Sequence, residues 1–248
     1  MLKSFQTELK LVETQMNKDI SFKSVTLEEL IDLPKTSLDN KLCPALFFAV
    51  TTLKSQKSNN NLINFATIFQ YIFIANQIHR LVKDEPMTEH ERQYPVLVGD
   101  FMLGQAFSKL CEGDLFNYSN DFIRIIEEMN EGVLMRWRLK NKNISSKDYR
   151  EILGKERGSL TALVGRLGAK VSGIEGPNAK KLEDFGYLIG MAWAAWEEPL
   201  GMPIVREYLS KAKVIINELR DQYSTKPLQE VFEFFNDKIR INSELASS

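Results

Sequence analysis

Two segments of this chain are apolar around nearly their whole circumference when they are drawn as helices. One covers residues 62–82 and the other covers residues 185–196. A helix without a polar face has no side that can face water, so each segment belongs in the interior of a protein. The sequence therefore predicts a helical bundle with two central helices.

Each of these helices runs into ionisable residues at one end. The charges after the first extend from Arg80 to Glu85, and those after the second are Glu197 and Glu198. Two buried helices with such ends can frame a polar site at one mouth of the bundle.

Helical periodicity continues along the rest of the chain, and segments that alternate apolar and polar residues are rare. Helices are expected at residues 2–19, 42–57, 62–84, 92–113, 118–141, 146–172, 178–198, 203–222 and 226–241. No linker rich in glycine, serine or proline divides the 248 residues. We predict an all-α fold with a single domain over residues 1–248, whose helices surround a central cavity.

Composition excludes several classes of protein. The chain has 32 Lys and Arg against 33 Asp and Glu, and a net charge of -1 gives no general affinity for nucleic acid. Two cysteines, Cys43 and Cys111, supply neither a disulfide framework nor zinc-ligand spacing, which favours a reduced, cytoplasmic setting. The N-terminal residues lack the pattern of a secretory signal, and no apolar run reaches the ~18 residues of a transmembrane helix.

Four stretches of the chain carry a family resemblance. They are "DNKLCPALFFAV" at 39–50, "ANQIHRLVKDE" at 75–85, "RQYPVLVGDFMLGQAFSKL" at 92–110 and "FGYLIGMAWAAWEE" at 185–198. In this order they resemble the G-K-R-x-R-P, H-D-D-x-x-D, A-G-D-Y and F-G-x-x-L-G-x-A-F-Q-x-x-D-D segments of the trans-prenyltransferases, the isoprenyl diphosphate synthase family. The resemblance covers about residues 35–205 and implies a bundle of the isoprenoid-synthase type.

Members of that family ionise an allylic diphosphate and join the carbocation to isopentenyl diphosphate. They gather Mg²⁺ between two aspartate-rich helix ends, because diphosphate leaves only when its charge is neutralised. In this chain Arg80 and Leu81 stand where the first two aspartates belong, and only Asp84 remains. Arg80 and Asp84 are four residues apart on a helix, so they are expected to pair and to place a cation where a metal should lie.

The second aspartate-rich segment keeps two carboxylates. Glu197 and Glu198 fall on the paired aspartates, whereas Gly201 stands at the last position of the motif. The two glutamates are either a solvated helix end or, with Asp84, residual metal ligands.

Basic residues that would bind substrate phosphates are partly retained. Lys41 matches one such residue, but Cys43 stands where an arginine belongs and cannot donate its bidentate hydrogen bonds. Lys155, in "GKERGSL", matches another phosphate-binding lysine, and Arg92 opens the third stretch. These three basic residues, Lys41, Arg92 and Lys155, are the substrate-binding candidates.

The whole pattern resembles the non-catalytic small subunit, component 1, of two-component heptaprenyl-type diphosphate synthases, which supply menaquinone side chains. The resemblance implies no catalytic residue and no cofactor in this chain, and a catalytic large subunit that carries Mg²⁺ and binds isoprenyl diphosphates in the complex. A homodimer is the alternative assembly in isolation. Bulky residues on 62–73 and 96–107 would then limit the length of the product.

Two other functions stay open from the sequence. One is a divergent prenyltransferase or terpene synthase that works alone with Glu197, Glu198 and Asp84. The other is a helical binding protein for an apolar isoprenoid ligand, without catalysis.

Overall fold

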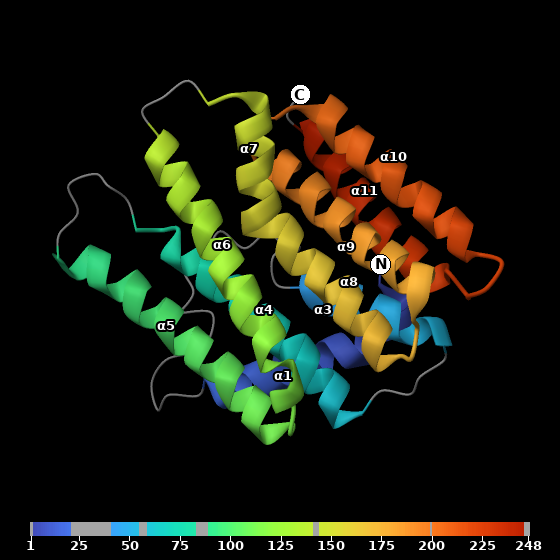
Figure 1. Ribbon diagram of the computed structural model, residues 1–248, viewed down its shortest axis with the longest axis horizontal. Helices are drawn as coiled ribbons and strands as arrows, with labels where there is room; N and C mark the ends of the chain where they lie inside the picture. The colour runs from blue at the N-terminus through green and yellow to red at the C-terminus, as the bar shows by residue number, and fades with distance from the viewer. Residues whose placement is uncertain are drawn as a thin grey trace. The chain divides into compact units, whose positions relative to one another are not determined.

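The computed structural model describes residues 2–20, 41–54, 59–82, 89–140, 144–198 and 200–245. Every regular element in these ranges is helical (Figure 1). The α-helices are α1 (Gln6–Asp19), α3 (Leu42–Thr51), α4 (Asn60–His79), α5 (Glu89–Glu112), α6 (Ser119–Leu139), α7 (Ser146–Leu153), α8 (Ser159–Val171), α9 (Gly176–Glu197), α10 (Met202–Leu219) and α11 (Lys226–Leu245). Short 3₁₀ turns cover Lys3–Phe5, Thr52–Lys54 and Phe116–Tyr118. The prediction of an all-α fold is confirmed.

The chain divides into two compact units. Unit 1 contains Met1–Phe5, Ala45–Lys57 and Ile123–Ser248, and unit 2 contains Gln6–Pro44 and Ser58–Phe122. The single domain over residues 1–248 stays a prediction. Within the described ranges, none of the helices combines the length and apolarity that a bilayer crossing needs.

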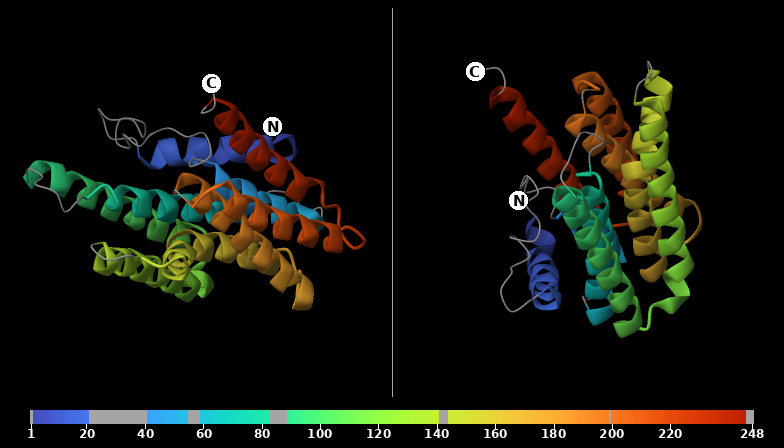
Figure 2. Two further views of the ribbon diagram at one scale, coloured as in Figure 1. Left: turned by 90° about the horizontal axis from the view of Figure 1, so that it is seen from above. Right: turned by 90° about the vertical axis from the view of Figure 1, so that its left-hand side faces the viewer.

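Helix α4 forms the apolar centre of unit 2. The Asn59 side chain caps its first turn by accepting a hydrogen bond from the Leu62 amide at 2.9 Å. From Leu62 to Ile78 nearly every side chain is buried, and α1 and α5 both pack against α4 (Figure 2). The predicted interior helix is confirmed, but it ends at His79 rather than at residue 84.

Helix α9 forms the apolar centre of unit 1, between α8 and α10 (Figure 1). Its glycines let α8 approach closely. A β-carbon on Gly186 would lie 2.1 Å from the Thr161 carbonyl oxygen, and one on Gly190 would lie 1.9 Å from Thr161 Oγ1. The glycine spacing that carried part of the family resemblance is therefore a requirement of helix packing.

The helix predicted over residues 146–172 is interrupted. Between α7 and α8 the chain makes one π-helical turn, Gly154–Gly158. Such turns insert an extra residue into a helix and are frequent at functional sites. A β-carbon on Gly158 would lie 2.7 Å from the Tyr187 ring, so the turn packs against α9 only because this residue has no side chain.

Candidate functional site

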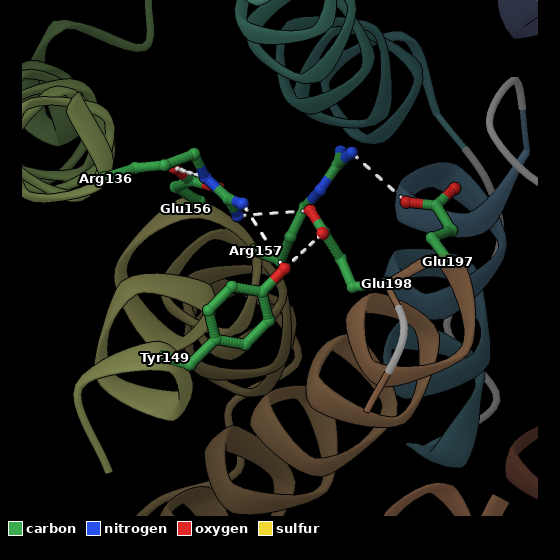
Figure 3. Close-up of polar contacts among 6 residues, drawn as sticks. All are labelled: Arg136, Tyr149, Glu156, Arg157, Glu197 and Glu198. Carbon is green, nitrogen blue, oxygen red and sulfur yellow. Dashed lines mark hydrogen bonds and ion pairs between the residues drawn. The ribbon is translucent and has the colours of Figure 1, made fainter. Parts of the chain in front are cut away.

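Polar side chains from α6, α7, the π-helical turn and the end of α9 converge in unit 1. They are Arg136, Tyr149, Glu156, Arg157, Glu197 and Glu198, which we call the carboxylate–guanidinium cluster (Figure 3). The cluster brings together the two glutamates that the sequence matched to the second aspartate-rich motif.

Glu156 is the most deeply buried member of the cluster. Its side chain is 0% exposed, and it accepts two hydrogen bonds from Arg136, Nε to Oε1 at 2.9 Å and Nη2 to Oε2 at 2.8 Å. Burial acts to lower the pKa of Arg136, but the hydrogen bonds and charge of Glu156, together with the charge of Glu198, raise it overall. Arg136 therefore stays cationic, and the buried carboxylate is compensated.

Arg136 also holds Glu198. Its Nη2 lies 3.1 Å from Oε1 of Glu198, and the Tyr149 hydroxyl donates a hydrogen bond to the other carboxylate oxygen. Burial and this hydrogen bond raise the pKa of Tyr149, so the phenol remains a donor at neutral pH. One guanidinium thus joins two carboxylates, one from the π-helical turn and one from the end of α9.

Glu197 pairs with a different arginine, Arg157. Arg157 Nη2 lies 3.2 Å from Oε2 of Glu197, and Trp193 Nε1 donates to Oε1 at 2.8 Å. The Arg157 guanidinium also stacks 4.9 Å from the centre of the Trp193 ring, and its side chain is 3% exposed. Both glutamates are therefore occupied by cationic and N–H or O–H donors, which is not the environment of a solvated helix end.

Lys155 contacts a different partner. Its ammonium lies 2.9 Å from Oε2 of Glu131 on α6, and this hydrogen bond raises the pKa of Lys155. In the π-helical turn, Lys155, Glu156 and Arg157 therefore each have a different partner: Glu131, Arg136 and Glu197. Sequence reasoning proposed Lys155 as a phosphate ligand and missed its two neighbours.

In unit 2, the end of α4 meets the Gly99–Asp100 pair of α5. A β-carbon on Gly99 would lie 2.2 Å from Cδ2 and Nε2 of His79, and Nε2 lies 3.3 Å from Oδ1 of Asp100. Asp100 itself is exposed. The Gly-Asp pair that the resemblance singled out therefore accommodates the His79 ring.

The remaining candidates belong to unit 2, and part of them lies beyond the description. Arg80 follows α4 as a turn, whereas Asp84 lies outside the described residues, so their ion pair stays a prediction. Lys41 is exposed immediately before α3, and Arg92 is in α5, although its side chain lies outside the description. In the part of the chain that the structure describes, no three His, Cys, Asp or Glu side chains gather as metal ligands.

The chain has the all-α fold of the isoprenyl diphosphate synthases. Residues 86–201 match the family model described as polyprenyl synthetase. No curated protein sequence matches the chain.

Solved structures share this fold over almost the whole chain. A polyprenyl synthase from Caulobacter crescentus CB15, complexed with calcium and isoprenyl diphosphate, is 18% identical with a TM-score of 0.79, covering 96% of each chain. A geranyl diphosphate synthase small subunit from Antirrhinum majus is 17% identical with a TM-score of 0.69, covering 93% of this chain and 98% of that one. A deletion mutant of the heterotetrameric geranyl pyrophosphate synthase of mint is 16% identical with a TM-score of 0.68, covering 95% and 100%.

Proposed function

We propose that this chain is a non-catalytic, regulatory subunit of a heteromeric long-chain trans-polyprenyl diphosphate synthase. It pairs with a catalytic large subunit that holds the Mg²⁺ and binds the isoprenyl diphosphates. The observation that carries the proposal is that Glu197 and Glu198 each accept hydrogen bonds or ion pairs from a guanidinium, that of Arg157 and that of Arg136.

These contacts oppose a magnesium site. Mg²⁺ needs hard oxygen ligands in a near-octahedral shell. To reach Glu197 and Glu198, the ion would have to displace two arginines, one of them buried, and leave them beside another cation. Breaking a buried ion pair by removing one partner costs about 3–5 kcal/mol. The residues of the cluster therefore do not fit the group that the family uses to neutralise diphosphate.

The relatives are compatible with either role. The Caulobacter protein was solved with calcium and isoprenyl diphosphate, whereas the Antirrhinum protein is a small subunit and the mint protein is heterotetrameric. Since one fold accommodates both roles, the assignment depends on the site residues. Here the first motif has Arg80 and Leu81 in place of carboxylates, and the second has its carboxylates neutralised.

Helix α6 carries exposed apolar side chains that a partner could cover. Ile123, Leu134 and Trp137 are 42%, 55% and 63% exposed, and their spacing places them on one face of the helix. Exposed apolar side chains that line one face are typical of a protein–protein contact. We infer that the catalytic subunit covers this face.

The proposed product class rests on the resemblance of the whole sequence pattern to the small subunits of heptaprenyl-type synthases. We propose that the complex makes a heptaprenyl-class diphosphate for menaquinone. In it, large side chains of α4, over residues 62–73, and of α5, over residues 96–107, would limit chain growth by packing along the product tunnel.

The experiment is an Mg²⁺-dependent assay with farnesyl diphosphate and labelled isopentenyl diphosphate. The assay compares three samples: this chain alone, a polyprenyl synthase subunit with intact aspartate-rich motifs alone, and the mixture of the two. We expect long-chain product only from the mixture. The double variant L134D/W137D should abolish this gain, whereas V214D, at a 53% exposed position on α10, should preserve it. Turnover by the chain alone that E197Q/E198Q abolishes would instead establish a stand-alone synthase.

A further inference from the structure

A charged side chain is buried among the helices of unit 2. Lys109 of α5 is 1% exposed, and its Nζ lies 2.9 Å from Oδ1 of Asp19 at the end of α1. It also binds Glu112, one turn further along α5. Burial acts to lower the pKa of Lys109, but the hydrogen bonds to Glu112 and Asp19 raise it overall, so the buried group is an ammonium.

The Asp19 carboxylate is contacted by donor groups from three helices. Besides Lys109, the Tyr71 hydroxyl of α4 donates to Oδ2 at 3.0 Å, and Gln15 Nε2 of α1 donates to Oδ1 at 2.8 Å. Tyr71 is 0% exposed, and burial together with Asp19 raises its pKa strongly, so it remains a donor. A single carboxylate therefore connects α1 to both α4 and α5.

This carboxylate and a row of apolar side chains together dock the end of α1. Val12 and Met16 are the buried side chains within the helix, and Ile20, which follows it, is also buried. Asp19 is the last residue of α1, where the helix dipole disfavours an anion. This position is unfavourable in an isolated helix, and here Lys109 and Tyr71 compensate for it.

We propose that the Asp19–Lys109 pair is a latch that holds the C-terminal end of α1 on α4 and α5, and that its opening releases α1 from that end and uncovers α4. Lys109 keeps a partner when the latch opens, since the Glu112 side chain is 56% exposed and can accompany the ammonium toward water. The pair thus makes α1 a releasable cover of the most apolar helix in unit 2.

The test is hydrogen exchange, followed by mass spectrometry, on the full chain and its D19N variant. We expect the amides of α1 after Val12 to exchange at least tenfold faster in D19N, with α4, α5 and unit 1 unchanged. Two matched controls should match the wild type: E112Q, which leaves the Asp19–Lys109 pair, and K211M, which breaks the exposed pair between Lys211 and Glu207. Unchanged α1 exchange in D19N would overturn the latch, and so would equal acceleration across α1, α4 and α5.

The wild-type chain provides a second test that does not depend on how well the variant folds. At low denaturant, the last two turns of α1 should open and exchange before α4 does. A common exchange rate for α1 and α4 would contradict the proposal, since the two helices would then unfold as one body.

Discussion

The ring of His79 occupies the space that a side chain on Gly99 would need. The β-carbon of an alanine at residue 99 would stand 2.2 Å from two ring atoms, well inside van der Waals contact. His79 is the last residue of α4, so this contact fixes where α4 ends against α5. It gives the Gly-Asp pair of the sequence a packing role, independent of any substrate.

The variant G99A should lower the free energy of unfolding by about 1–3 kcal/mol, because the imidazole must move to admit the methyl group. The matched control is G104A on the same helix, where no atom lies within 4 Å of the new β-carbon. There alanine should stabilise the helix by about 0.5–1 kcal/mol. Urea unfolding measures both, and H79A/G99A should recover part of the loss. Equal stability of G99A and G104A would contradict the contact.

The variant R136M should be much more destabilising, because it leaves the fully buried Glu156 carboxylate without its bidentate partner. Loss of one member of a buried ion pair costs about 3–5 kcal/mol. R150M is the control, since Arg150 lies 3.9 Å from Glu207 with both side chains substantially exposed. Chemical unfolding should give a clearly lower free energy of unfolding for R136M than for R150M. Adding E156Q to R136M should restore stability, and a failure to do so would mean that the charge of Glu156 is not the cause.

Two glycines of α9, Gly186 and Gly190, contact different groups of Thr161 on α8, so alanine substitutions at the two positions should respond differently to a change at Thr161. At Gly186 the obstacle is the Thr161 backbone carbonyl, and at Gly190 it is the Thr161 hydroxyl. Both G186A and G190A should destabilise by about 1–3 kcal/mol through overpacking. The second change T161A should rescue G190A, because it removes the hydroxyl that blocks the new β-carbon. It should not rescue G186A, because the backbone carbonyl remains. Thermal melts of the four variants test this, and rescue of both would contradict the geometry.

The contribution of Lys109 to the free energy of unfolding should depend on pH only in the alkaline range. The folded-state pKa of Lys109 is raised above its ordinary value of 10.5, so its stabilisation is fully present below that value. It is lost as the pH rises through the folded-state pKa. The difference in unfolding free energy between the wild type and K109M should therefore be constant from neutral pH upward and shrink only in strongly alkaline solution. A difference that changes around neutral pH would contradict the assignment of Lys109 as the charged group.

Much of the fold could be predicted because helical periodicity and all-round apolarity are local signals. The interior position of 185–196 and of most of 62–82 followed from the absence of a polar face, whereas residues 79–82 are only partly buried or exposed. The interruption at Gly154–Gly158 could not be predicted, because the apolar pattern continues on both sides and a π-helical turn depends on tertiary contacts with Tyr187.

The candidate site was predicted in part. Glu197 and Glu198 were identified by motif, and Trp193 was expected in the core, where it is 1% exposed. Their partners Arg136 and Arg157 were not anticipated, because ion pairs between distant residues leave no trace in sequence spacing. The one available signal was "KER" between two glycines in an otherwise apolar segment, since charges enclosed in a core require partners.

The most direct test of the central claim is calorimetric titration of the full chain with inorganic diphosphate, with and without Mg²⁺. If Arg136 and Arg157 neutralise the glutamate pair, magnesium should add no binding at millimolar concentrations. Magnesium-dependent, stoichiometric binding of diphosphate that E197Q/E198Q abolishes would contradict the account.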